Sequence, residues 1–196
     1  MSAVRDDRPD TAEAVVIGAS AGGVEALLAL LVALPRGFTP PVLVVLHLPP
    51  HRPSRMVELM SRRCVLPVSE ALDKQPVQQG SVVFAPPDYH LLVEPDRHLS
   101  LSVDPPVLYS RPAIDPLFES AAAVYGAGLL GVLLTGASQD GSDGVAAIRR
   151  CCGRMWIQAP SDAKAPAMPS AALERAGADA VLTLDQLCRR FAAPVP

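Results

Sequence analysis

A serine, a histidine and an aspartate of the kinds that cleave esters stand in three separate parts of the chain. Ser20 is the centre of a G-x-S-x-G pattern that follows the apolar residues 15–17. His47 directly follows the apolar run 42–46, and Asp140 lies in a glycine-rich polar loop. A nucleophilic hydroxyl, an imidazole base and a carboxylate that orients the imidazole make up a hydrolytic triad, which is recognised by geometry and not by chain order.

Each of these residues also has a simpler explanation. Serine is a favoured helix N-cap, so Ser20 could do no more than begin a helix. His47 precedes two prolines by one residue and could be a turn histidine, and aspartate beside glycine commonly stabilises a loop. A glycine-rich turn after a first strand also holds phosphate in nucleotide-binding folds, but no acidic residue ends the second strand and no G-x-x-x-x-G-K-[ST] occurs. The coincidence at three strand ends favours the hydrolase.

The elements that must position these residues follow from hydrophobic patterning. Continuous apolar runs without alternation are typical of parallel strands covered on both faces, and sites form at the carboxyl ends of such strands. Strands of this kind are expected at 15–17, 42–46, 131–134, 154–158 and 180–183. Helices are expected at 24–34, 54–63, 114–125, 144–150, 170–176 and 184–191.

The short segments at 82–85, 91–94 and 99–103 have a different sequence pattern. Proline-containing turns separate them at hairpin spacing, which predicts an antiparallel extension. Strands that alternate with helices elsewhere in the chain predict layers of both. We therefore expect a doubly wound α/β fold, with a mostly parallel sheet, helices on both faces and an antiparallel β-hairpin extension.

Composition narrows the class of protein. The 196 residues, 49% hydrophobic and 19% charged, predict one globular domain over 13–196 after a flexible leader at 1–12. A net charge of −3 does not favour nucleic acid. Apolar runs shorter than a membrane span and an N-terminus without a signal core predict a cytoplasmic protein. The four cysteines show no C-x-x-C spacing and the histidines no ligand spacing, so neither a metal nor a cofactor is expected.

Five ordered blocks of this chain resemble the catalytic domain of the CheB protein-glutamate methylesterases of bacterial chemotaxis. They lie at 17–26, 44–50, 80–94, 110–118 and 134–144, and the resemblance covers about residues 13–190. It implies hydrolysis of glutamate γ-methyl esters on the methylated cytoplasmic region of a chemoreceptor, with release of methanol, and often deamidation of receptor glutamines. It also implies that Ser20 is the nucleophile, His47 the base and Asp140 the orienting acid.

The resemblance assigns the oxyanion site to backbone N–H groups. That of Ala21 follows the nucleophile, and that of Ala137 stands in the loop where the family has Thr-Gly-Met-Gly-x-Asp-Gly. Here Ala137 replaces methionine and Ser138 replaces glycine, and serine does not reach a positive φ as readily as glycine. We therefore expect an altered oxyanion geometry. Ala113 replaces a common serine, which predicts changed substrate contacts.

Partners and control follow from the same resemblance. Arg111 and Arg52 are predicted to contact the acidic receptor surface, although solvated charges at the rim of the site are the more common explanation for such arginines. Family members usually carry an N-terminal receiver domain, for which a leader at 1–12 is too short. This predicts an esterase that is ungated or controlled by a separate regulatory protein. Two alternatives stay open: a catalytically weak CheB-like binding module in a signalling complex, and an esterase or amidase for another substrate.

Overall fold

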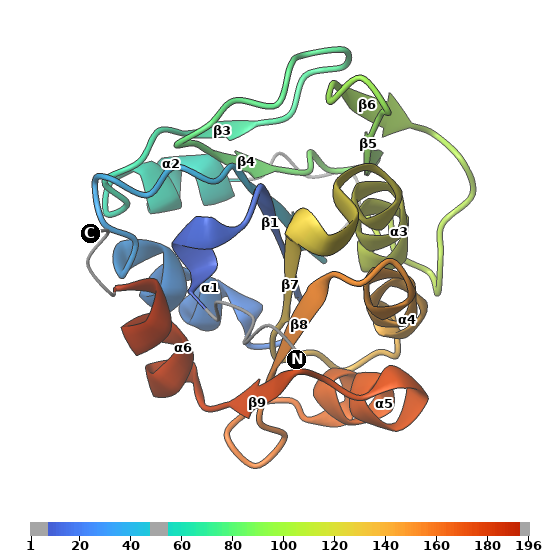
Figure 1. Ribbon diagram of the computed structural model, residues 1–196. Coiled ribbons are helices and arrows are strands. Elements are labelled where there is room, and N and C mark those ends of the chain that lie inside the picture. The colour runs from blue at the N-terminus through green and yellow to red at the C-terminus, as the bar shows by residue number, and fades with distance from the viewer. Residues whose placement is uncertain (1–7, 48–54, 193–196) are drawn as a thin grey trace, which may run out of the picture.

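The strands assemble into a parallel sheet with the first strand at its centre (Figure 1). The computed structural model describes residues 8–47 and 55–192. Within these ranges the sheet has seven strands in the order β3-β4-β2-β1-β7-β8-β9. They are β1 (Ala14–Ala19), β2 (Val42–Leu46), β3 (Val68–Glu70), β4 (Val82–Phe84), β7 (Leu129–Leu133), β8 (Arg154–Gln158) and β9 (Ala180–Leu182). The chain first builds outward on one side of β1 and then returns to build on the other.

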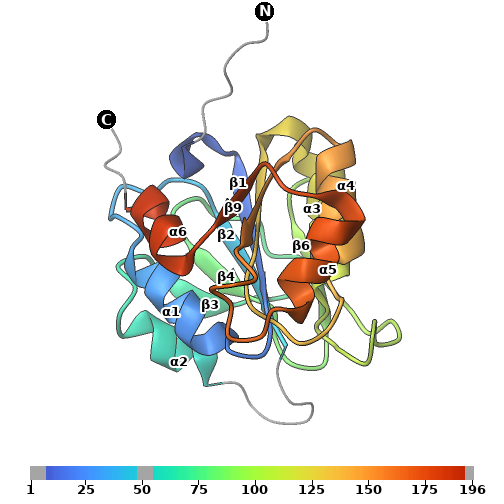
Figure 2. The same cartoon turned by 90° about the horizontal axis from the view of Figure 1, so that it is seen from below.

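Helices cover both faces of this sheet, which confirms the doubly wound fold (Figure 2). One face carries α1 (Gly23–Val32), α2 (Met56–Ser61) and α6 (Leu184–Phe191). The other carries α3 (Ile114–Tyr125), α4 (Ser142–Arg150) and α5 (Ala167–Ala176). Alternate residues of β1 point to opposite layers, so Val15 and Ile17 join the first core and Ala14 and Val16 the second. Burial on both faces explains the unbroken apolar run.

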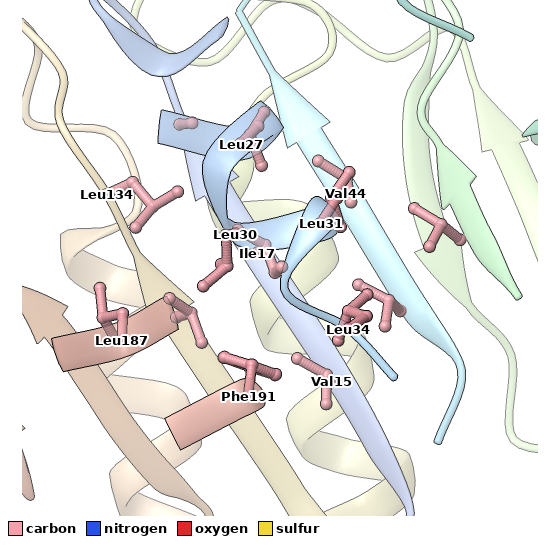
Figure 3. Packing of buried hydrophobic residues seen from close by; sticks show 14 of the residues in the cluster. Val15, Ile17, Leu27, Leu30, Leu31, Leu34, Val44, Leu134, Leu187 and Phe191 are labelled. Atoms are coloured by element: carbon pink, nitrogen blue, oxygen red, sulfur yellow. The ribbon is translucent and has the colours of Figure 1, made fainter. Parts of the chain in front are cut away.

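The first core lies between the central strands and helices α1 and α6 (Figure 3). Leu27, Leu30 and Leu31 of α1 pack there onto the strand side chains. Phe191 of α6 adds an edge-on contact with Trp156, whose ring centroid lies 5.8 Å away. This packing fixes the end of β1 and the start of α1 relative to each other, and Ser20 lies between them.

The antiparallel extension has fewer strands in the structure than the sequence predicts. Among the strands of the described residues, only β5 (His90–Val93) and β6 (Leu99–Ser102) pair in antiparallel fashion. The placement of 82–85 in that extension is wrong, because β4 pairs in parallel with β2 and its three residues are buried in the main sheet. The edge strand β3 has no counterpart among the sequence predictions, since its three residues are half-buried or exposed and form no apolar run.

The N-terminal segment also departs from expectation. Pro9–Thr11 forms a short 3₁₀ helix, and Pro9 and Ala12 are buried. Ala12 belongs to the first core. Residues 9–12 are therefore part of the packed body and not of a flexible leader. No helix within the described ranges is long and apolar enough to cross a membrane.

The strand order creates a topological switch at β1. After β1 the chain continues to β2 on one side, while β7 pairs with β1 on the other. The loops that leave the carboxyl ends of β1 and β7 therefore diverge toward opposite faces of the sheet, and open α/β sheets place their ligand sites at such a point.

Candidate active site

Three side chains from separate loops meet at this carboxyl edge. Ser20 directly follows β1, His47 directly follows β2, and Asp140 lies in the loop after β7. The Nδ1 atom of His47 lies 3.1 Å from Ser20 Oγ, and its Nε2 atom lies 2.6 Å from Asp140 Oδ2. Both distances are those of hydrogen bonds. The structure thus brings together the three side chains that the sequence predicts as a triad.

The hydrogen bonds define which ring nitrogen of His47 acts as the base. An ionised carboxylate only accepts hydrogen bonds, so Nε2 carries the proton and donates it to Asp140. The bare Nδ1 atom then accepts the hydroxyl proton of Ser20. In the serine-protease arrangement the two nitrogens have the opposite assignment. The chemistry is the same, because either nitrogen of a neutral imidazole serves as a base.

Asp140 is fully buried at the start of α3. Its Oδ2 atom accepts the backbone N–H of Ile114 at 2.6 Å, and its Oδ1 atom accepts those of Asp115 and Gly141 at 3.1 and 2.9 Å. Burial acts to raise the pKa of Asp140, but the hydrogen bonds from His47 and from these backbone groups outweigh it and hold the pKa below its ordinary value. The carboxylate therefore stays charged beside the imidazole.

This capping carboxylate explains why α3 can begin at an alanine. Ala113 is the N-cap of α3 and has no side-chain acceptor to offer. None is needed, because Asp140 already accepts the N–H of Asp115 and Pro116 has no N–H to satisfy. The Ala113 side chain is fully buried, and its own N–H donates to Nδ1 of His90 at 3.2 Å. It has no exposed surface with which to touch a substrate.

Two glycines allow the turn around Ser20 to form. Gly22 has φ +77 as the N-cap of α1, a conformation that glycine adopts without steric cost. Gly18 lies where an added Cβ would stand 2.6 Å from Cγ2 of Ile114. Without a side chain at Gly18, the start of α3 comes close to the end of β1. Asp140, which caps that helix start, is thereby brought toward the serine turn.

Thr135, which is not among the residues predicted from the sequence, fixes the same turn by hydrogen bonds. It is 1% exposed, and its carbonyl accepts the N–H of Ser20 at 2.9 Å. Its hydroxyl donates to the carbonyl of Ala21 at 2.9 Å and accepts the N–H of Ala165 at 2.8 Å. Its own N–H donates to Gln158 Oε1 at 2.9 Å. The signal for this role is a small polar residue directly after a buried apolar run.

The two predicted oxyanion residues flank the serine turn and the aspartate loop. Within the described residues, the N–H groups of Ala21 and Ala137 donate no hydrogen bond to a protein acceptor. Ala137 is exposed, and Ser138 is half-buried. Ser138 does not have a positive φ, and its hydroxyl accepts the N–H of Asp140 at 3.3 Å. Serine at this place therefore supports the aspartate loop through its hydroxyl, and the altered oxyanion geometry stays a prediction.

Arg111 forms hydrogen bonds with the backbone of its own loop. Its Nη1 atom donates to the carbonyls of Val103 and Asp104 at 2.7 and 3.0 Å, so the side chain ties together the two ends of loop 103–111. A role in substrate contact stays a prediction. Arg52 lies outside the described residues. Among those that are described, no three histidine, cysteine, aspartate or glutamate side chains form a group able to hold a metal ion.

A second carboxyl, that of Asp115, lies beside Asp140 in the first turn of α3. Its Oδ1 atom accepts the N–H of Gly144 at 2.7 Å, and the residue is 8% exposed. Burial, and then the charge of Asp140, raise the pKa of Asp115 to about 7. In an unfolded chain an aspartate titrates at about 3.9. Its contribution to folding stability is therefore fully present below about pH 4 and is lost as the pH rises through about 7.

Asp115→Asn should remove this pH dependence, because asparagine keeps an acceptor for Gly144 and cannot ionise. Between pH 5 and pH 8 the wild type should lose about 2 kcal/mol more stability than the variant, a difference of about 4–8 °C in Tm. Thermal unfolding of both proteins across this range measures the effect. The control is Asp143→Asn, which neutralises a carboxylate that is 62% exposed. Parallel curves of Tm against pH for the wild type and Asp115→Asn would contradict the prediction.

Comparison with known proteins shows which family has a sequence similar to this chain. The family model described as CheB methylesterase matches residues 15–191. A putative protein-glutamate methylesterase/protein-glutamine glutaminase of Leptospira interrogans is 39% identical over 179 residues, which cover 91% of this chain and 93% of that protein. A protein-glutamate methylesterase/protein-glutamine glutaminase of Trichodesmium erythraeum is 37% identical over 91% of this chain, but only 52% of its own length is covered.

A solved structure supports the same comparison. The crystal structure of the Thermotoga maritima CheB methylesterase catalytic domain superposes with a TM-score of 0.87 at 29% sequence identity. The match covers 94% of this chain and 99% of that one. The similarity therefore extends over the sheet, both helical layers and the loops that carry the three converging side chains.

Proposed function

The chain belongs to the CheB methylesterase family, and from this premise we propose that it hydrolyses glutamate γ-methyl esters on the cytoplasmic region of a chemoreceptor and releases methanol. The observation that carries the proposal is the continuous hydrogen-bonded chain from Ser20 through His47 to Asp140. A protein that only bound a partner would not need a nucleophile, a base and a buried carboxylate in this order.

The reaction follows from the atoms that face one another. Ser20 Oγ attacks the ester carbonyl carbon while Nδ1 of His47 takes the hydroxyl proton. The imidazolium that forms is stabilised by the charge of Asp140 and returns its proton to the methoxide, which leaves as methanol. A water molecule then attacks the acyl-enzyme with His47 again as base, and the products are the free glutamate and Ser20. The same steps on a glutamine side chain release ammonia.

The oxyanion of the tetrahedral intermediate needs donors that the fold has not already used. The N–H groups of Ala21 and Ala137 meet this condition among the described residues. That of Ala21 also stands just before the start of α1, where the helix dipole favours negative charge. We assign the oxyanion site to these two groups.

The receptor region that carries such esters faces the cytoplasm, and we place the protein there. Arg111 lies two residues before the N-cap of the helix that Asp140 caps. Its positive charge is suited to attract the acidic surface around the methylated glutamates. The contacts of its Nη1 atom with Val103 and Asp104 would hold that charge in place.

The test is methanol release by the full chain from a soluble receptor fragment that carries radiolabelled methyl esters. We expect volatile label to be released, and at a much lower rate from the small molecule N-acetylglutamate γ-methyl ester at equal ester concentration. A receptor fragment without methyl groups serves as the background. Release from the small ester alone would indicate another substrate, and receptor binding without release would indicate a binding module. Either result would refute the proposed function.

A further inference from the structure

Two aspartates at this site cap helices reciprocally. Asp140 lies just before α4, and its carboxylate accepts N–H groups of Ile114 and Asp115 at the start of α3. Asp115 lies in the first turn of α3, and its carboxyl oxygen accepts the N–H of Gly144 in the first turn of α4 at 2.7 Å. The two helix starts are therefore fastened to each other by reciprocal bonds.

Close packing leaves little freedom around this pair. An added Cβ at Gly144 would stand 2.5 Å from the Cβ of Phe118 and 3.2 Å from Asp115 Oδ1, so α4 begins directly against α3. Gly144 is only four residues beyond Asp140. A shift of the α4 start would thus move the backbone that carries the Asp140 carboxylate. His47 contacts the same carboxylate at 2.6 Å.

We propose that Asp115 is a positioning residue for the esterase reaction, because its bond to Gly144 fixes the loop that holds Asp140 against His47. Asp115 takes no part in the proton transfers and acts only through Asp140. Misplacement of a reacting group by about 1 Å costs on the order of 100-fold in rate, so a bond that removes such freedom has a large effect on kcat. The proposal rests on the proposed function of Ser20, His47 and Asp140.

The charges around Asp115 are compatible with this role. Its carboxyl faces Asp140, and Asp143 of α4 adds a more distant negative charge. Asp143 is paired with Arg175 of α5 at 3.0 Å on the surface. The pKa of Asp115, raised to about 7 by burial and by Asp140, keeps much of the residue neutral near neutral pH. Asp140 can then remain charged without a second full charge beside it.

The test compares variants of Asp115 in the methanol-release assay at pH 6.5. Asp115→Ala removes the acceptor for Gly144, and we expect kcat to fall by about 10- to 100-fold with KM within twofold of the wild type. Asp115→Asn keeps an acceptor oxygen and should recover most of kcat, while the similarly sized Asp115→Leu should not. Asp143→Ala is the matched control, because it removes an exposed aspartate one residue before Gly144 and should leave kcat unchanged.

A second readout does not depend on activity. The short Nε2–H···Oδ2 hydrogen bond of His47 should give a low-field proton resonance in the wild type and in Asp115→Asn, and this resonance should shift or broaden in Asp115→Ala. If Asp115→Ala does not fold, Asp115→Glu displaces the acceptor by one methylene and should show the same loss of kcat. Wild-type kcat and an unchanged resonance in a folded Asp115→Ala would overturn the proposal. A wild type that releases no methanol would instead refute the proposed function.

Discussion

Ser20→Ala is expected to lower kcat for methanol release by about 10⁵- to 10⁶-fold, while receptor binding is retained. The variant removes the only atom that forms the acyl bond, and water cannot take its place with the same orientation. The structural cost is small, because Ser20 Oγ contacts His47 at 3.1 Å and the residue is only half-buried. The backbone bonds of Ser20 to Thr135 and Gly23 do not involve the side chain.

The measurement is single-turnover release of labelled methanol, with Tm and receptor affinity determined on the same samples. Ser100→Ala is a suitable control, since this serine lies on β6, in the antiparallel pair and not at the triad. Its hydroxyl donates to Glu94 at 2.6 Å. We expect the control to release methanol at the wild-type rate. Substantial turnover by Ser20→Ala would remove Ser20 from the role of nucleophile and with it the proposed mechanism.

Asp140→Asn should impair both catalysis and folding. Within the described residues, the side-chain oxygens of Asp140 accept every hydrogen bond that they make: from His47 and Ile114 on Oδ2, and from Asp115 and Gly141 on Oδ1. An asparagine must turn its NH₂ group toward one of these pairs. If the NH₂ group takes the place of Oδ1, the buried N–H groups of Asp115 and Gly141 lose their acceptor, which costs about 1–3 kcal/mol each.

The other orientation of asparagine inactivates the base. An NH₂ group in the place of Oδ2 would donate to Nε2 of His47, so the ring proton would move to Nδ1 and that atom could no longer accept the proton of Ser20. We expect kcat to fall by about 10³- to 10⁴-fold and Tm to fall by about 4–8 °C.

The control for Asp140→Asn is another aspartate that accepts a backbone N–H. Asp179 Oδ2 accepts the N–H of Met155 at 2.8 Å. Asp179 directly precedes β9, so it lies at the amino ends of the parallel strands, whereas the triad lies at their carboxyl ends. Asp179→Asn should keep the wild-type kcat with a smaller fall in Tm. Thermal unfolding and the methanol assay measure both variants. Wild-type turnover in Asp140→Asn would show that the imidazole needs no carboxylate here.

Much of the fold could be predicted because local patterns encode it. The apolar run 42–46 is unbroken since β2 is covered on both faces, and such runs indicate a parallel sheet before any pairing is known. Pairing partners are not encoded in this way. The segment 82–85 resembles a hairpin strand in sequence, yet β4 pairs with β2, and each pair of partner residues, such as Val42 and Val82, is 40 positions apart in the chain. The edge strand β3 carries no hydrophobic signal because one side of it faces solvent.

The same distinction applies to the candidate site. Ser20, His47 and Asp140 could be proposed together because strand ends in a parallel sheet share one edge, and the structure has them within hydrogen-bonding distance. Their catalytic roles stay predictions until they are measured. Neither the ring orientation of His47 nor the roles of Thr135 and Asp115 follow from the sequence. Each depends on which donor or acceptor the folded backbone places opposite the side chain.

The cap that Asp140 makes on α3 has a practical consequence for anyone who wants to capture the substrate. The carboxylate that supports the imidazole also completes a helix, so the acid end of the triad belongs to the architecture. The serine end does not, since among the described residues its hydroxyl has the imidazole as its one hydrogen-bond partner. A substitution of Ser20 should therefore give an inactive protein that keeps its fold and still binds the receptor, whereas a substitution of Asp140 would disturb the fold together with the chemistry.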